Sequence, residues 1–228
     1  MVSLRKVQYK QWWHNLLGLN LTKERPLFSY FIDDRYLILR HKSPLMLLKS
    51  VALTSSFVGA FIIGMYFLTF EQARFFFPDN PVPVTLQTFG ILLMGSIYGL
   101  RLSFISISFY LILGISGVPI FQGHNGGIEY AMGVTGGYLI GFFLASLLNS
   151  FLSTRGFNRG LSIWSMLASN MVIYLPALIW LSIGDFSWPE EGKLYQAILP
   201  FLLGDFIKLI GASIVISFLW RLVGRSED

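Results

Sequence analysis

Long uncharged stretches separate the charged residues through most of the chain. Five stretches within residues 50–184 run for 21 to 27 residues without Asp, Glu, Lys or Arg. Each is long enough for a membrane helix, which needs roughly 20 apolar residues to cross a hydrocarbon core about 30 Å thick. A sixth apolar run, from Lys193 to Arg221, is interrupted only by Asp205 and Lys208. The pattern predicts helices near residues 46–70, 85–100, 102–118, 133–153, 161–183 and 196–220.

The predicted second helix, 85–100, is short for a membrane span, so an earlier start, a tilt or a break all remain open. The connections between the predicted helices are short, which favours one compact bundle over two domains. We therefore predict an all-α integral membrane protein in which residues 45–228 form one bundle of six transmembrane helices.

Basic residues are distributed unevenly over the predicted loops. If both termini lie in the cytoplasm, 14 Lys and Arg residues fall on the inner side and two, Arg74 and Lys193, on the outer side. Cytoplasmic loops of membrane proteins carry an excess of Lys and Arg. We therefore predict a multi-pass protein of the plasma (inner) membrane with both termini in the cytoplasm.

Residues 1–44 form a basic extension ahead of the first predicted helix. It has no apolar run of roughly 7–15 residues before a small-residue cleavage site, so we do not expect it to be a secretory signal. The stretch from Tyr9 to Leu21 mixes Trp and Leu with Lys10 and His14, which is typical of a helix on the inner membrane surface. A basic tail that only fixes the topology is the alternative, and the sequence leaves both open.

The composition agrees with a membrane protein. Hydrophobic residues make up 54% of the chain and charged residues 13%, against roughly 25% charged in a soluble domain. This excludes a soluble enzyme and a disordered chain, because a soluble surface must be wetted. The net charge of +5 lies largely in residues 1–44, so it reflects topology, and we expect no nucleic-acid partner. The chain has no cysteine for a thiolate site, and we expect no metal and no cofactor.

Asp205 and Lys208 lie deep inside a predicted helix. Their spacing of three residues places them on one helix face. A charge in the middle of a span costs on the order of 2.5–3.5 kcal/mol, so the pair is expected to face the bundle interior or a water-filled cavity. One interpretation is an ion pair that only fixes helix packing. The interpretation that we favour is a pair of contacts for a ligand with donor and acceptor groups.

Small residues recur every four positions in the first predicted helix, at Ala52, Ser56, Ala60 and Gly64. Inside lipid, such a stripe lets another helix approach closely. The other helix belongs either to this chain or to a separate membrane subunit, and the sequence leaves both open.

Two segments on the predicted outer side combine backbone constraints with hydrogen-bonding groups. Prolines hold residues 81–88 extended, and this segment contains Thr85 and Gln87. Residues 117–127 and 133–138 are rich in glycine, which permits close approach of the backbone to a ligand. Flexible linkers are one interpretation. Because both segments lie above the bundle that holds the charged pair, we predict a ligand site covered by these loops.

An enzymatic alternative comes from residues 114–117, Gly-Ile-Ser-Gly, which match the GxSG string of intramembrane serine proteases. That chemistry needs a general base beside the serine. The three histidines, His14, His41 and His124, all lie outside the later predicted helices. No GxxxxGK[ST] string is present for phosphate binding either, so we predict that the chain is not an enzyme.

Five blocks along residues 46–221 carry a family resemblance: PVPVTLQTFGILLMGSIYG, YLILGISGVPIFQG, GVTGGYLIGF, IYLPALIWL and ILPFLLGDFIKLIGA. In this order they resemble the BioY family, the biotin-binding membrane subunits of energy-coupling factor (ECF) transporters. The resemblance implies a six-helix substrate-binding subunit (S component) that captures biotin from outside. It implies an ECF transmembrane coupling subunit and two ATPase subunits as partners. An S component for another vitamin or small acid is the alternative.

The resemblance also implies roles for single residues. Biotin has a ureido ring with N–H donors and a carbonyl, an apolar ring and a carboxylate tail. We expect Asp205 to accept a ureido N–H and Lys208 to donate to the carbonyl. The remaining expected contacts are neutral hydrogen bonds from Asn125, Thr85 and Gln87, ring contacts from Phe121 and Tyr138, Thr135 at the mouth of the pocket, and the coupling subunit packed on Ala52, Ser56 and Ala60.

The chain departs from the family pattern in three places. Val134 stands where the family usually has a proline before TGGY, and residues 122–125 read Gln-Gly-His-Asn in place of the usual glycine-rich loop. Residues 1–44 lie outside the resemblance altogether.

Overall fold

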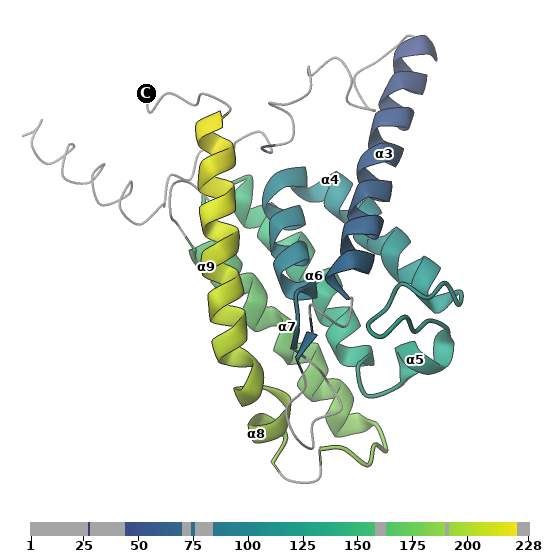
Figure 1. Cartoon of the computed structure of the whole chain (residues 1–228), viewed down its shortest axis with the longest axis vertical. Coiled ribbons are helices and arrows are strands. Elements are labelled where there is room, and N and C mark those ends of the chain that lie inside the picture. Colours follow the sequence, from purple (N-terminus) through teal and green to yellow (C-terminus); the bar gives the residue numbers. More distant parts are fainter. Residues whose placement is uncertain are drawn as a thin grey trace, which may run out of the picture.

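The computed structural model describes residues 27, 44–69, 74–75, 84–157, 163–189 and 192–222. These residues are helical, apart from a short antiparallel ribbon and the connecting loops (Figure 1). The all-α prediction is therefore confirmed for this part of the chain. The elements are α3 (Pro44–Leu68), β1 (Arg74–Phe75), β2 (Val84–Thr85), α4 (Gln87–Ile115), α5 (Ile128–Met132), α6 (Gly136–Ser153), α7 (Trp164–Ile183), α8 (Lys193–Ala197) and α9 (Leu199–Leu222).

Five described helices are long and apolar enough to cross a membrane, namely α3, α4, α6, α7 and α9. Helices α6 and α7 begin within three residues of their predicted starts and end at the predicted residues 153 and 183. The second and third predicted helices differ from the expectation, because both lie within the single element α4.

The chain turns back on itself inside α4, at Gly99. This residue has φ 74° and ψ 168°, a conformation that essentially only glycine adopts. Ser103 Oγ donates to the carbonyl of Met94 at 3.4 Å, and Gln87 Nε2 donates to Tyr110 Oη at 3.0 Å. In a straight helix Gln87 and Tyr110 would be about 35 Å apart at 1.5 Å per residue. Residues 87–98 and 100–115 are therefore two antiparallel legs.

Helix α6 lies against both legs of α4 and against α7. Asn149 Nδ2 donates to the carbonyl of Leu92 at 2.7 Å, and Ser150 Oγ donates to Ser103 Oγ at 2.7 Å. On the opposite side, a Cβ atom on Gly141 would lie 2.5 Å from the carbonyl oxygen of Ile173. The absence of a side chain at this position lets α6 and α7 approach backbone to backbone.

Helix α3 stands at one edge of the bundle and α9 at the other (Figure 1). One face of α3 packs on the bundle through Val58, Phe61 and Met65, which are buried. The small residues predicted to form a helix contact lie on the other face, where Ala52, Ser56 and Ala60 are exposed. A contact between this stripe and another described helix of the same chain, one of the two open interpretations, is therefore wrong.

Of residues 1–43, the structure describes Leu27. Its side chain is fully buried in an apolar cluster on the α9 side of the bundle. The rest of residues 1–43, including the predicted interfacial helix at 9–21, lies outside the described residues. The other members of the cluster are Leu92, Met166, Leu209, Ala212, Ile216 and Trp220.

Candidate ligand-binding site

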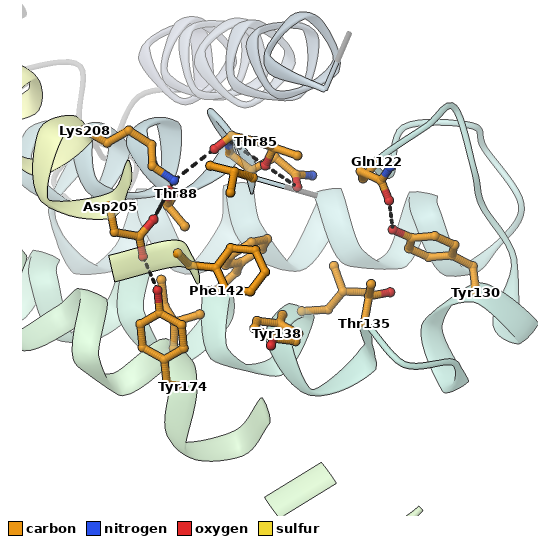
Figure 2. Close-up of a pocket in the computed structure, with 15 residues that line it drawn as sticks. Thr85, Thr88, Gln122, Tyr130, Thr135, Tyr138, Phe142, Tyr174, Asp205 and Lys208 are labelled. Carbon is orange, nitrogen blue, oxygen red and sulfur yellow. Dashed lines mark hydrogen bonds and ion pairs between the residues drawn. The ribbon is translucent and has the colours of Figure 1, made fainter. Parts of the chain in front are cut away.

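A cavity, partly open to solvent, is lined by α4, α6, α7 and α9, with contributions from β2, α5 and the loop between α4 and α5. Small-molecule sites usually combine apolar walls with a few polar groups. The polar groups of this cavity gather at two ends, with aromatic side chains between them (Figure 2). We call these the charged end, at Asp205 and Lys208, and the neutral end, at Gln122, Tyr130 and Thr135.

Asp205 and Lys208 project from α9 into the charged end. The Lys208 ammonium forms an ion pair with Asp205 Oδ1 and donates to the carbonyl of Thr85 at 3.0 Å. The two side chains are 4% and 7% exposed. Removing charges from water costs several kcal/mol per ion, and here the two charges offset each other. The pair faces the bundle interior, as the spacing in the sequence predicted.

The carboxylate of Asp205 accepts four hydrogen bonds from its own chain. Oδ1 accepts from Lys208 and from Thr88 Oγ1, and Oδ2 accepts from Asn170 Nδ2 at 2.9 Å and from Tyr174 Oη. A carboxylate offers about four acceptor positions, so these donors saturate it. The Thr88 bond is the weakest by length, because its 3.4 Å exceeds the roughly 2.5–3.0 Å usual between oxygen atoms.

Lys208 retains a donor for a ligand. An ammonium group carries three N–H donors. The described part of the chain provides two acceptors for them, Asp205 Oδ1 and the Thr85 carbonyl. Because Lys208 lines the cavity, its third N–H is available to an acceptor inside it.

Hydrogen bonds fix the segment that leads from β2 into α4. Thr85 Oγ1 donates to Gln87 Oε1 at 3.1 Å, and it accepts from the backbone N–H of Gln87 at 3.2 Å. Gln87 Nε2 donates to Tyr110 Oη at 3.0 Å on the other leg of α4. These bonds hold the Thr85 carbonyl in place for Lys208, and they leave the Gln87 side chain bound to protein groups.

Aromatic and aliphatic side chains line the middle of the cavity. Tyr138 and Phe142 lie one helical turn apart on α6 (Figure 2). Tyr138 Oη donates to the carbonyl of Ala197 at 2.7 Å, so its polar atom is satisfied and its ring remains for apolar contact. Leu139, Ile173 and Phe201 complete this apolar wall.

The neutral end holds hydrogen-bonding groups without a formal charge. Tyr130 Oη donates to Gln122 Oε1 at 3.1 Å. Thr135 lies beside them at the start of α6 (Figure 2). Among the described residues that line the cavity, Lys208 and Asp205 carry the formal charges.

The structure brings six of the eight predicted contact residues to the cavity wall: Asp205, Lys208, Tyr138, Thr85, Gln87 and Thr135. The other two lie behind the wall. The Asn125 side chain is exposed and donates through Nδ2 to the carbonyl of Gln122 at 2.9 Å. Phe121 is fully buried, because its ring fills the space over Gly114 and stacks on Tyr130 at 5.4 Å.

Several residues of the site were not predicted from the sequence. Asn170 and Tyr174 lie one turn apart on α7 and both donate to Asp205. Asn170 has the one amide side chain in the predicted helix 161–183, which was a usable signal, whereas nothing in the sequence distinguished Tyr174. Gln122 and Tyr130 come from the loop after α4 and from α5, where only the fold brings them together.

Ser116, the serine of the GxSG string, lies outside the cavity. It caps the C-terminus of α4, is exposed, and donates to the carbonyl of Leu113 at 2.8 Å. The string therefore falls at a helix end on the surface.

Comparison with known proteins gives a consistent family signal. Residues 42–225 match the BioY family. A protein from Pyrococcus horikoshii described as "Probable biotin transporter BioY" is 34% identical over 169 residues, which cover 73% of this chain and 93% of that protein. The "Biotin transporter BioY" of Lactococcus lactis subsp. cremoris is 33% identical over 71% of this chain and 86% of its own length.

A solved structure shares the fold. It is described as the "S-component for biotin from an ECF-type ABC transporter" and superposes with a TM-score of 0.64 at 24% identity. The match covers 77% of this chain and 93% of the solved chain.

Proposed function

The chain belongs to the BioY family through residues 42–225, and from this premise we propose that it takes up biotin as the S component of an ECF transporter. The observation that carries the proposal is the cavity with a buried ion pair at one end and aromatic walls beyond it. Relatives named as biotin transporters and a fold shared with a biotin S component support it.

The ureido ring of biotin occupies the charged end in this proposal. The free N–H of Lys208 donates to the ureido carbonyl. One ureido N–H takes the place of Thr88 at Asp205 Oδ1, because that bond is the longest of the four that Asp205 accepts. Asn170 and Tyr174 stay on Oδ2 and hold the carboxylate in position. A site that pairs each polar group of the ring disfavours analogues that lack one of them.

The other predicted contacts either touch the ligand or hold the cavity wall in place. The rings of Tyr138 and Phe142 cover the apolar part of biotin, and Thr85 and Gln87 fix the wall beside Lys208. Thr135 lies beside the tail. Asn125 and Phe121 act from behind the wall, by holding the loop that carries Gln122.

We further propose six crossings of the plasma membrane with both termini in the cytoplasm. The support is that the two legs of α4 run antiparallel about Gly99, which is the arrangement that two crossings by this one element require. The distribution of Lys and Arg supports the orientation.

The exposed face of α3 is the proposed contact with the ECF transmembrane coupling subunit. Ala52, Ser56 and Ala60 are exposed there, and small residues let a partner helix approach closely. The two ATPase subunits of the ECF module supply the energy, so this chain acts as a transport subunit and performs no catalysis of its own.

The binding proposal is tested by calorimetry on purified protein in detergent. We expect biotin to bind wild-type protein, and Asp205→Ala and Lys208→Ala each to weaken binding by about 12- to 160-fold. Each variant loses a hydrogen bond between biotin and a charged group, which contributes about 1.5–3 kcal/mol. Asp205→Asn serves where the alanine variant does not fold, because it keeps the side-chain volume.

Asp185→Ala is the matched control, because it removes a carboxylate from an exposed loop residue that does not line the cavity. It is expected to bind biotin like wild type. Wild-type affinity in both charged-end variants would contradict the assigned contacts. Binding of another vitamin or small acid from a panel, with no binding of biotin, would replace biotin as the substrate.

A further inference from the structure

The two ends of the cavity differ in the kind of chemistry they present. At the charged end, Asp205 and Lys208 neutralise each other. At the neutral end, the described lining groups are the amide of Gln122 and the hydroxyls of Tyr130 and Thr135 (Figure 2). A ligand tail that ends there meets uncharged groups among these residues.

Gln122 is held in one orientation by bonds on both sides. Its backbone carbonyl accepts from Asn125 Nδ2 at 2.9 Å, and Phe121 N donates to the carbonyl of Asn125 at 3.0 Å, which closes the loop. Its side-chain oxygen accepts from Tyr130 Oη at 3.1 Å. Within the part of the chain that the structure describes, the amide nitrogen has no acceptor, so its two N–H donors remain for a ligand.

We propose that Gln122 binds the end of the ligand tail as a neutral hydrogen-bond donor, so that the pocket accepts a carboxylate or an uncharged carbonyl at this position. The proposal rests on the proposed biotin function and extends its substrate class to biotin derivatives with an amide at the tail. Selection of biotin-like ligands over other small molecules then comes from the charged end, where the ureido ring pairs with Asp205 and Lys208. The tail end requires an acceptor oxygen and does not require a negative charge.

The physical reason is that an amide N–H bonds to both kinds of oxygen with moderate strength. A hydrogen bond raises affinity by about 2- to 12-fold between neutral groups and by about 12- to 160-fold when one partner is charged. A salt bridge to a cation in a dry pocket would instead reject the amide strongly, since the cation would be left unpaired. A neutral donor therefore predicts a modest preference for the acid.

The experiment compares biotin with biotin carboxamide by calorimetry on the full-length protein. We expect wild-type protein to bind both, with dissociation constants within about tenfold of each other, which corresponds to about 1.4 kcal/mol. Gln122→Leu is expected to lower the affinity for both ligands, by about 2- to 12-fold for the carboxamide and by at least as much for biotin.

A substitution that changes the preference between biotin and the carboxamide provides the sharper test. Gln122→Glu places a carboxylate against the tail. The affinity for biotin is therefore expected to fall by more than tenfold relative to the affinity for the carboxamide, whose NH₂ group can donate to the new carboxylate. Ser116→Glu is the matched control, because it adds the same charge at an exposed position away from the cavity. It is expected to leave the ratio of the two affinities unchanged.

Tyr130 is the positioning residue in this scheme. Tyr130→Phe removes the hydroxyl that holds Gln122 Oε1 and keeps the ring that stacks on Phe121. It is expected to weaken both ligands less than Gln122→Leu does. In the Gln122→Leu background, Tyr130→Phe is expected to cause a smaller loss of affinity than it causes alone, because the side chain that Tyr130 positions is gone.

Three outcomes would overturn the inference and leave the biotin function standing: wild-type protein binding biotin more than 100-fold tighter than the carboxamide, Gln122→Leu leaving both affinities unchanged, or Gln122→Glu and Ser116→Glu giving the same ratio. Failure of wild-type protein to bind either ligand would instead contradict the proposed function itself.

Discussion

Helices α6 and α3 carry the same kind of sequence signal and meet different surroundings. Each has small residues at helical spacing, Gly137 and Gly141 on α6 and the stripe Ala52, Ser56 and Ala60 on α3. Of the spanning residues, 61% are buried in α6 and 17% in α3. The α6 glycines lie against the backbone of α7, whereas the α3 stripe is exposed. Small-residue spacing therefore predicts a close helix contact and does not identify which helix supplies it.

The rest of each helix explains the difference. Away from its glycines, α6 has Asn149 and Ser150, whose hydrogen bonds tie it to both legs of α4. Two sides of the helix therefore have partners within the chain, and a third side, with Ile140, Leu144 and Phe151, is exposed. Helix α3 has one apolar face for the bundle. Its exposed face adds Ile63 and Phe67 to the small residues, a composition suited to lipid or to a membrane partner.

The largest expected effect is on folding, through α6. A side chain at Gly141 would meet the backbone of Ile173, which moves only if α7 moves. Overpacking costs typically about 1–3 kcal/mol and more where backbone must shift, so Gly141→Leu is expected to give little monodisperse protein and a clearly lowered melting temperature. The measurements are size-exclusion yield and thermal unfolding in detergent.

The matched control for this variant lies on α3. A Cβ atom on Gly59 has no heavy atom within 4 Å, so Gly59→Leu is expected to fold like wild type. Equal losses for the two substitutions would mean that the contrast between the two helices does not hold.

The next effect is on transport, through α3. Ala60→Trp is expected to reduce biotin uptake by cells at least tenfold, because the indole would block close approach of the proposed coupling subunit. Biotin binding to the purified variant is expected to stay unchanged, because Ala60 is exposed on α3 and does not line the cavity. Uptake of labelled biotin and calorimetry on the same variant measure the two quantities separately.

Leu203→Trp makes the same kind of change on α9, at a side chain that is 73% exposed near the other edge of the bundle. Uptake is expected to survive there. If Ala60→Trp lost binding and uptake together, misfolding would explain the result and the interface proposal would lack support.

Much of the fold was predictable because a helix that crosses lipid needs a run of roughly 20 apolar residues. Uncharged stretches had to become helices, and α6 and α7 end where the pattern predicted. The hairpin inside α4 was harder to place. The prediction divided it at the charged residue Arg101, whereas the chain turns at Gly99, where backbone conformation decides and hydropathy carries no signal.

The residues of the site also fall into those that the sequence could predict and those that it could not. Asp205 and Lys208 were predictable because a charge in an apolar run must have a compensating partner. Tyr174 and Gln122 were not, because a neutral side chain costs little wherever it points, and only tertiary contacts direct these two into the cavity. Asn125 and Phe121 were predicted as contacts from their loop alone, and the local fold turned one outward and the other beneath the wall.

The smallest expected effect concerns how firmly α3 is held to the bundle. Tyr98 Oη donates to the carbonyl of Phe57 at 3.2 Å, and the two rings meet edge to face at 5.8 Å. Tyr98→Phe keeps the ring and removes the hydrogen bond, so about 0.5–1.5 kcal/mol is lost. Because the bond joins α3 to α4, the loss is expected to appear as faster amide hydrogen exchange in α3, by about 2- to 12-fold. Exchange in α6 is expected to stay as in wild type, since its own bonds are untouched. Equal acceleration in both helices would show that α3 opens only together with the whole bundle, and the burial difference between the two helices would then have no counterpart in local stability.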